Sequence, residues 1–310
     1  MKSLLLADAE LDFSAQEKLL EEVEPCFTEA DNASFRTPPS MQDVLETVSS
    51  SNLNAAPGTD GIPSLFYKVC WDTVGLSLTE VMREIFCCKP LTASFRISMM
   101  VFGSKPKKPN SKKPEDKRRI SPLNSDFKVA SGLDARKLKK TVTHSLSPLQ
   151  LVAGDDRRIH HGINLARDAI WAAGRRGKGC GILDTDLVAG FDYMSLCWCL
   201  RVMEKKGACP ELITKLKKLY SNNYSLVVVN NMPGAAVKNV RLTLRQGDVP
   251  SMELFSFGID PLLRLLDRIL EGILITSTPV LEPPTGMSYL YNPWSCATRL
   301  LAMLMTANLL

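Results

Sequence analysis

The sequence lacks the marks of several common protein classes. It holds only three histidines, and its nine cysteines form no CxxC pair, so it predicts neither a zinc site nor a disulfide scaffold. Long apolar runs are missing too: the most apolar helical stretch, 261–275, is interrupted by charged residues and cannot span a bilayer. The N-terminus reaches an acidic residue too early for a signal-peptide core. We therefore expect an intracellular protein, cytoplasmic or nuclear, with no membrane segment.

Charge is unevenly placed along an otherwise ordinary globular composition. The 310 residues are 45% apolar and 23% charged, and the net charge is only +5. Between Lys105 and Arg119, however, lie eight cations and three prolines, and the prolines prevent a helix there. We expect an extended basic loop, continued by the helical cations of 136–140. Such a loop is either a solvated surface or a site for a polyphosphate, because cations this close repel one another without an anion.

The spacing of apolar residues predicts helices and short strands as far as residue 278. Helices are predicted over 11–24, 65–71, 76–87, 193–206, 210–220 and 250–272, with a further helix that carries Met41 to Val48 and is capped by the segment Thr37-Pro38-Pro39-Ser40. Strands are predicted over 97–102, 181–187, 224–230 and 237–244, the last two joined through Met232-Pro233-Gly234. Asn54 to Gly61 is a dense turn, in which Pro57 fixes φ and two glycines permit positive φ.

Two aspartates fall within an apolar segment that predicts a buried strand. Asp184 and Asp186 are two residues apart, so the period of a strand places both on one face. Carboxylates this close repel each other unless a cation lies between them, which favours a divalent metal site for at least one of them. Asp192, just past the strand, is most simply interpreted as the N-cap of the next helix. The Arg245–Ser251 turn, taken alone, is explained as a capped strand-to-helix connection.

Five short segments form an ordered series of motifs. They are Asn54-Ala-Ala-Pro-Gly-Thr-Asp-Gly-Ile62; Asp116-Lys-Arg-Arg-Ile-Ser-Pro-Leu-Asn124 with Asp126-Phe-Lys128; Gln150 with Arg157 and Ile159; Asp186-Leu-Val-Ala-Gly-Phe-Asp192; and Arg245-Gln-Gly-Asp-Val-Pro-Ser251. In this order and spacing they resemble the xxxPGxDGI, RPIxLLN…DYK, QxGFxxGRxI, DxxKAFD and RQGDPLS patterns of the reverse transcriptase domain of LINE-type, non-LTR retrotransposons. The resemblance runs from about Asn54 to Leu266.

The resemblance implies two-metal nucleotidyl transfer to a primer 3′-OH, with Mg²⁺ or Mn²⁺ as cofactor. The family's metal-binding aspartate precedes an aromatic residue by five positions, which selects Asp186, with Phe191, over Asp184. Asp186 would then be the catalytic carboxylate, and the backbone carbonyl of Leu187 would be a further metal ligand.

The same resemblance implies how the substrates would bind. Phe191 would be the gate that packs where a 2′-hydroxyl would lie. Lys105 and Arg118 would neutralise the incoming triphosphate, and Gln246 and Gly247 would line the floor beneath the nucleotide and the template. The implied partners are an RNA template, a DNA primer and deoxynucleoside triphosphates.

The sequence also departs from the family pattern. Arg119 replaces the family's proline, Ala189 its lysine and Gly190 its alanine. The family's motif C, a YADD or FADD hairpin that supplies a second pair of carboxylates, should follow the long helix. No Asp-Asp pair occurs after Asp156, so motif C is missing from this sequence, and so is the thumb that should follow it.

The last residues offer an explanation for the missing motif. Ala302 to Asn308 contains two methionines, which have a single codon and nearly fix the nucleotides as GCN ATG CTN ATG ACN GCN AAY. Read from the third base of the Ala302 codon, with T and G at the first two open bases, this stretch encodes Tyr-Ala-Asp-Asp. We infer a one-base shift between about Thr278 and Leu301; the alternative is a coincidental Met-Leu-Met-Thr.

The predicted fold is α+β: an incomplete right-hand polymerase with fingers and a partial palm but no thumb. Residues 1–53 would be a helical lead-in, 54–278 the fingers and partial palm, and 279–310 a degenerate, frameshifted tail. The predicted function is RNA-directed DNA polymerase by ancestry, inactive as translated. Two alternatives stay open: a non-catalytic nucleic-acid-binding fragment that uses the Lys105–Arg119 loop, and a decayed retroelement product without a selected function.

Overall fold

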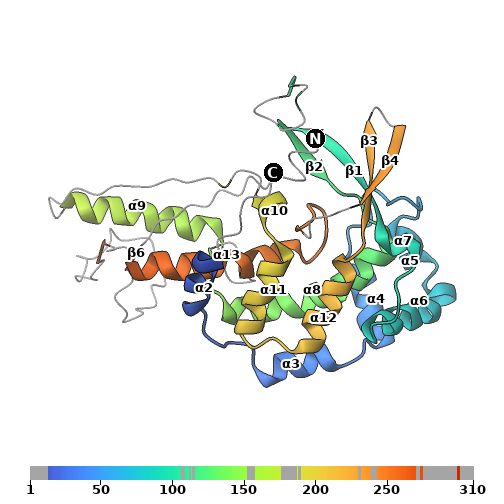
Figure 1. Ribbon diagram of the computed structural model, residues 1–310, viewed down its shortest axis with the longest axis horizontal. Helices are drawn as coiled ribbons and strands as arrows, with labels where there is room; N and C mark the ends of the chain where they lie inside the picture. The colour runs from blue at the N-terminus through green and yellow to red at the C-terminus, as the bar shows by residue number, and fades with distance from the viewer. Residues whose placement is uncertain are drawn as a thin grey trace, which may run out of the picture.

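A body of packed helices carries a four-stranded sheet that projects from one side in the computed structural model of the chain (Figure 1). The structure describes residues 13–105, 109–111, 113, 116–151, 158–175, 187, 190–229, 232–238, 243–269, 273–274 and 299–300, without the side chains of 173, 174, 192 and the last four of these residues. The observed class is α+β with a mixed sheet.

Most of the predicted elements are present within a few residues of their predicted bounds. The helices are α2 (Phe13–Glu21), α3 (Glu29–Arg36), α4 (Met41–Ser50), α5 (Ser64–Val69), α6 (Trp71–Phe86), α7 (Ala93–Arg96), α8 (Ser125–Ser145), α9 (Ile159–Arg175), α10 (Gly190–Tyr193), α11 (Leu196–Lys205), α12 (Pro210–Tyr220) and α13 (Ser251–Ile269). The strands are β1 (Ile97–Ser104), β2 (Lys117–Ile120), β3 (Tyr224–Val229), β4 (Met232–Lys238), β5 (Ile273–Leu274) and β6 (Arg299–Leu300). No helix in these ranges is long and apolar enough to cross a membrane.

The N-terminal helices begin at strong local signals. Thr28 caps α3 and Ser40 caps α4, and each hydroxyl accepts a hydrogen bond from the N–H of an aspartate three residues on. The carboxylates of these residues, Asp31 and Asp43, accept the N–H of the caps in return, so both helices start with a complete capping box. The prediction that the segment 37–40 caps the next helix is therefore confirmed, and the capping residue is Ser40.

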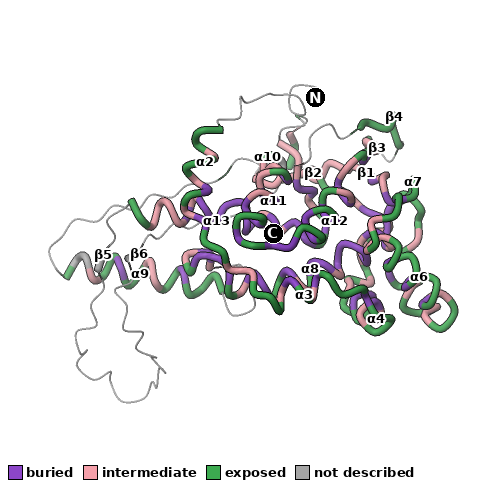
Figure 2. The backbone as a smooth tube through the Cα atoms, turned by 60° about the horizontal axis from the view of Figure 1, so that its bottom comes forward, coloured by how far each residue is buried: buried purple, intermediate pink, exposed green. Residues whose placement is uncertain are grey.

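One hydrophobic core joins helices from both ends of the described chain. Buried side chains of α3 and α4, such as Phe35 and Val44, belong to the same cluster as Leu200 of α11 and Phe257 of α13. The long helix α8 contributes buried residues to this core together with α11 and α12, and Figure 2 shows buried residues recurring along all three helices. Helices α3 and α4 of the lead-in thus pack on the same core as the later helices, whereas Leu20 and Val23 form a separate small cluster with Val202.

The four-stranded sheet has the order β2-β1-β3-β4, with β1 and β3 parallel and both outer pairs antiparallel. The prediction of a loop over Lys105–Arg119 is wrong for its last three residues, because they pair with β1 as part of β2. The prediction that Met232-Pro233-Gly234 connects two strands is also wrong, since these residues lie within β4. Proline is tolerated there because β4 is an exposed edge strand and Pro233 pairs beside a bulge.

The segment before α11 differs from its prediction. The helix predicted over 193–206 is divided into α10 and α11, because Ser195 is extended and forms an isolated bridge with Thr243. The N-cap of α11 is this Ser195, whereas Asp192 lies inside α10, so the interpretation of Asp192 as an N-cap is wrong. The strand predicted over 181–187 lies outside the described residues except for Leu187.

Candidate functional site

The first motif turn packs directly on the second motif. The Thr59 hydroxyl donates a hydrogen bond to Oδ1 of the buried Asn124 across 3.1 Å, and the Asp60 N–H lies 3.4 Å from the same oxygen. A Cβ on Gly58 would come within 2.0 Å of Asn124 Oδ1 and 2.4 Å of its backbone nitrogen. Glycine is therefore the residue that fits at position 58. The Asn124 amide also donates to the Ser94 carbonyl at 3.1 Å, which ties the turn to α7.

The second motif also contacts the fifth. The Ser121 N–H donates to the Gln246 carbonyl across 2.9 Å. Gly247 has a φ of +110°, which glycine adopts without strain, and a Cβ there would lie 3.1 Å from the Ser121 carbonyl oxygen. Because Ser121 and Asn124 belong to one short segment, the structure brings Gln246 and Gly247 close to the Gly58–Asp60 turn.

The two cations predicted to neutralise a triphosphate lie at one end of the β1–β2 hairpin. Arg118 of β2 pairs with Gly103 of β1, and Lys105 directly follows β1. Side chains alternate along a strand, so Arg118 shares a face with Gly103, whereas Lys117 shares the other face with Ser104 and donates to its hydroxyl at 3.0 Å. The structure therefore brings Lys105 and Arg118 to the same end of the hairpin. Arg118 lies three residues before Ser121 in the sequence.

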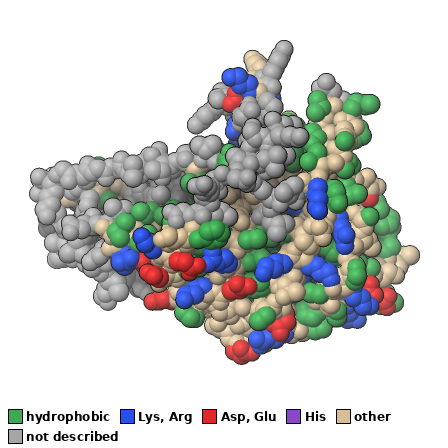
Figure 3. Space-filling view, in the orientation of Figure 1, with side chains coloured by type: hydrophobic (Ala, Val, Ile, Leu, Met, Phe, Trp, Pro, Cys, Tyr) green, Lys and Arg blue, Asp and Glu red, His purple; other side chains and the backbone are tan. Residues whose placement is uncertain are grey.

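The neighbouring hairpin is apolar rather than basic. Val229 and Met232, at the projecting ends of β3 and β4, are 58% and 71% exposed. Hydrophobic side chains gather at this end of the sheet in Figure 3. The sheet therefore presents cations on one hairpin and apolar side chains on the other.

Phe191 packs on the helix that follows the fifth motif. Its ring centroid lies 4.9 Å from that of Phe255 in α13. A Cβ on Gly190 would lie 3.2 Å from the Phe255 ring, so an alanine there would require the ring to move. This contact gives a physical reason for Gly190 where the resembled family has alanine. Leu187 is 43% exposed and lies beside Gly190.

The predicted metal ligand Asp186 lies outside the described residues, as does Asp184. Within the part of the chain that the structure describes, no three histidine, cysteine, aspartate or glutamate side chains form a group that could hold a metal ion. A carboxylate at Asp186 and the Leu187 carbonyl are hard oxygen donors of the kind that Mg²⁺ prefers. They supply a single negative charge.

Two carboxylates, of Asp60 and Asp126, lie where the first motif turn packs on the second motif. Burial raises the pKa of Asp126, and the nearby Asp60 carboxylate raises it further. Burial, with the same two carboxylates, raises the pKa of Tyr67 to about 12. Burial lowers the pKa of Lys128, although Asp60 acts in the opposite direction, and this ammonium donates to the Ala56 carbonyl at 3.1 Å. Negative charge is therefore concentrated at this turn, whereas Lys117 and Arg118 place positive charge on the β1–β2 hairpin.

The cations of 136–140 do not simply continue the basic loop. Arg136 pairs with Glu46 of α4 at 2.5 Å, and the Lys137 ammonium donates to the Ser34 carbonyl at 2.7 Å. These two side chains anchor α8 to the N-terminal helices. The helical prediction for 136–140 is confirmed, and Arg136 and Lys137 bind groups of the N-terminal helices.

Gln150 of the third motif is a packing residue. It is buried, and its side-chain amide donates to the Ser256 carbonyl at 2.9 Å and to Asp260 Oδ1 at 3.0 Å, both on α13. Arg157 lies outside the described residues. Ile159 is the exposed first residue of α9.

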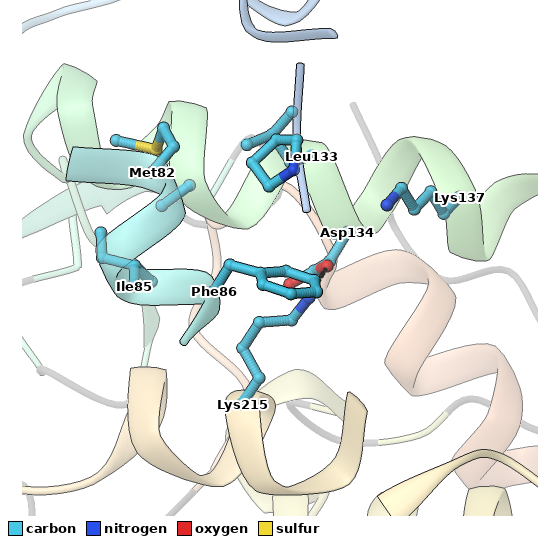
Figure 4. Close-up of a pocket in the computed structure, with 9 residues that line it drawn as sticks. Met82, Ile85, Phe86, Leu133, Asp134, Lys137 and Lys215 are labelled. Carbon is cyan, nitrogen blue, oxygen red and sulfur yellow. Dashed lines mark ion pairs between the residues drawn. The ribbon is translucent and has the colours of Figure 1, made fainter. Parts of the chain in front are cut away.

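A small pocket lies between α6, α8 and α12, with about 300 Å³ of empty volume including its open mouth. Its wall includes an ion pair between Lys215 and Asp134 at 2.5 Å, and the Lys215 ammonium lies 5.0 Å from the Phe86 ring centroid (Figure 4). None of the residues predicted to bind nucleotide or metal lines this pocket.

The fifth motif contains two buried charges that sequence reasoning missed. Arg245 is 9% exposed and Asp248 6%, and their nearest side-chain atoms, Nη2 and Oδ2, are 3.7 Å apart. The spacing of three residues between Arg245 and Asp248 is the only local signal in the sequence for an ion pair here. Their burial depends on aromatic residues from distant parts of the chain.

No protein-family model matches the chain. Over 251 residues it is 27% identical to the Transposon TX1 uncharacterized 149 kDa protein of Xenopus laevis, a match that covers 81% of this chain. The match spans 19% of the length of that relative. The similarity supports a transposon-derived origin for the chain.

Proposed function

We propose that the chain is a reverse transcriptase-like fragment of non-LTR retrotransposon origin: the fingers and an incomplete palm, able to bind nucleic acid but not to catalyse on its own. The observation that carries this proposal is the series of contacts between motifs. The Gly58–Asp60 turn packs on Asn124, and Ser121 of the same segment bonds to Gln246. Segments far apart in sequence thus lie in contact, and these contacts support the proposal.

The binding roles follow from this arrangement. Lys105 and Arg118, on one hairpin, are the groups proposed to neutralise the phosphates of an incoming deoxynucleoside triphosphate. Gln246 and Gly247 would form the floor beneath nucleotide and template, and Phe191 would exclude a 2′-hydroxyl from its position against Phe255. An RNA template and a DNA primer are the proposed partners.

Catalysis is proposed to be absent from these 310 residues alone. Asp186 is the proposed catalytic carboxylate, and with the Leu187 carbonyl it would hold Mg²⁺ or Mn²⁺, which would supply activation of the primer hydroxyl. The sequence holds no Asp-Asp pair after Asp156 to complete that site. The one-base shift inferred for the tail stays a hypothesis, and the nucleotide sequence from Leu266 onward tests it: a shifted frame without TAT-GCN-GAY-GAY rules it out.

A primer-extension assay tests the proposal. The wild-type chain is incubated with an RNA template, an annealed DNA primer and deoxynucleoside triphosphates in Mg²⁺ or Mn²⁺, beside Asp186→Ala and, as a surface control, Asp168→Asn. We expect no incorporation above the Asp186→Ala background. Robust extension by wild type and Asp168→Asn that Asp186→Ala abolishes would overturn the claim that the chain does not catalyse.

A second candidate is a non-catalytic nucleic-acid-binding fragment that binds RNA through the Lys105–Arg119 segment and has no nucleotide site. The cations of the β1–β2 hairpin favour it, because backbone binding needs only positive charge along a strand. RNA binding that weakens with salt and is indifferent to Asp186→Ala agrees with both candidates. Specific binding of deoxynucleoside triphosphates that depends on Gln246 favours the first, and RNA binding alone favours the second. No binding of either kind favours a decayed product.

A further inference from the structure

Arg245 is a cation held between two aromatic rings. Its guanidinium carbon lies 4.8 Å from the ring centroid of Phe127 in α8 and 4.9 Å from that of Tyr220 in α12. Both rings are almost fully buried. A planar, delocalised guanidinium can stack on two rings at once, which a compact and strongly hydrated ammonium cannot do.

The polar edge of this cation makes no hydrogen bond within the described part of the chain. None of its three nitrogens has a hydrogen-bond partner among the described residues, and the same holds for Asp248 Oδ2 and the Tyr220 hydroxyl. Asp248 Oδ2 is 3.7 Å away and supplies the opposing charge. The charge of Arg245 is thus balanced by two ring faces and one carboxylate. These groups hold the Arg245 side chain in place, so its role is structural and not ligand binding.

The backbone of Arg245 begins the turn that carries Gln246 and Gly247. Its carbonyl accepts the Asp248 N–H at 3.2 Å and the Ser251 hydroxyl at 2.8 Å, which closes the turn onto the start of α13. Asp248 Oδ1 in turn accepts the Ser131 hydroxyl at 3.0 Å and the Val249 N–H at 2.9 Å. The turn is therefore fixed on one side by contacts with α8 and α12.

On its other side, the turn contacts Ser121, the residue that follows β2. The Gln246 carbonyl accepts the Ser121 N–H, and Gly247 lies against the Ser121 carbonyl. We propose that Arg245 is a positioning residue: the stacking of its guanidinium between Phe127 and Tyr220 sets the position of the Gln246–Gly247 turn relative to Ser121. It thereby fixes the proposed nucleotide floor relative to the Arg118 hairpin. The functional part of this inference rests on the proposed function.

The test separates local positioning from overall stability. The variant is Arg245→Met/Asp248→Asn, which removes both charges and keeps an Oδ1 oxygen for Ser131 and Val249. Its matched control is Lys215→Met/Asp134→Asn, which removes another buried pair in which a cation lies over an aromatic ring. Arg245→Lys is added because it keeps the charge without the planar stack. Hydrogen exchange at the Ser121 amide is measured at equal margins below each protein's unfolding temperature.

We expect Ser121 to exchange at least tenfold faster in both Arg245 variants than in wild type, and at the wild-type rate in the Lys215 control. Affinity for deoxynucleoside triphosphates should fall at least tenfold in the same two variants. Unchanged Ser121 exchange in the Arg245 variants overturns the positioning role. So does equally fast exchange in the control, because the change is then only loss of stability. If wild type binds no nucleotide while Ser121 responds as expected, the proposed function fails and the positioning of the turn stands.

Discussion

The Ser121 N–H reaches the Gln246 carbonyl across 2.9 Å, although the two residues lie in different halves of the sequence. This hydrogen bond joins the end of β2 to the turn before α13. Through it, the hairpin that carries Arg118 is joined to the turn that carries Gly247. The proposed nucleotide site uses both segments, the cations of the hairpin and the Gln246–Gly247 floor of the turn.

Replacing Gly58 by alanine should destabilise the protein strongly. The new Cβ would lie 2.0 Å from Asn124 Oδ1 and 2.4 Å from backbone, so the turn must move away from the second motif. We expect a loss of about 1–3 kcal/mol in the free energy of unfolding, measured by urea denaturation. Gly103→Ala is the control, because its Cβ would find an ordinary contact at 3.4 Å from Ile120. Equal losses in the two variants would contradict the packing described.

Glu253→Gln should stabilise the protein at neutral pH and not at low pH. Burial raises the pKa of Glu253, although Lys139 lowers it, and Oε2 has no hydrogen-bond partner among the described residues. The unfolded chain ionises above pH 4.5 while the folded chain resists, so wild-type stability falls as the pH rises through the folded pKa. We expect a gain of about 1–3 kcal/mol at pH 7 that vanishes below about pH 4.5, measured by thermal unfolding. Glu204→Gln, exposed on α11, should show no such pH-dependent gain.

Removing Lys206 should be costly because it leaves a buried carboxylate. Its ammonium lies 2.7 Å from Asp260 Oδ2, and both side chains are fully buried. Burial acts to raise the pKa of Asp260, but Lys206 and Arg264 together hold it below the usual value. Lys206→Met should lose about 3–5 kcal/mol of unfolding free energy at pH 7, and Lys206→Met/Asp260→Asn clearly less. A double variant as unstable as the sum of both single variants would contradict the coupling.

The β1–β2 hairpin should account for a defined part of the salt dependence of RNA binding. Lys105→Gln/Arg118→Gln should reduce the slope of log affinity against log salt by about 0.7 for each RNA phosphate that the hairpin no longer neutralises. Lys205→Gln/Lys217→Gln removes the same charge from α11 and α12 and should leave the slope unchanged. Filter binding of a single-stranded RNA over a salt series gives both values. Equal changes in the two variants would mean that only net charge matters.

Local signals in the sequence were sufficient for several elements, whereas α3, α7, α9 and the first part of α8 were not predicted. Ser40 marked the start of α4 through its own hydroxyl and Asp43, and 210–220 was predicted as the residues that α12 contains. Proline and glycine likewise indicated the turn that packs on Asn124. Such signals act within a few residues, so they can be read without knowing the fold.

Features set by distant partners could not be read in this way. β2 begins at Lys117 because β1 pairs with it, and the prolines that indicated a loop end just before that point. The burial of Arg245 depends on Phe127 and Tyr220, which come from two other helices. The division of one predicted helix before α11 depends on the bridge from Ser195 to Thr243. In each case a non-local contact decided the structure.

Hydrogen exchange of the full chain, with and without an RNA template annealed to a DNA primer, tests most directly whether the motif segments form one binding site. We expect peptides covering 54–62, 117–124 and 245–249 to gain protection together, and to lose this protection as salt is raised. Protection in only one of these segments, or binding that protects none of them, would contradict a shared site. So would the absence of any binding at low salt.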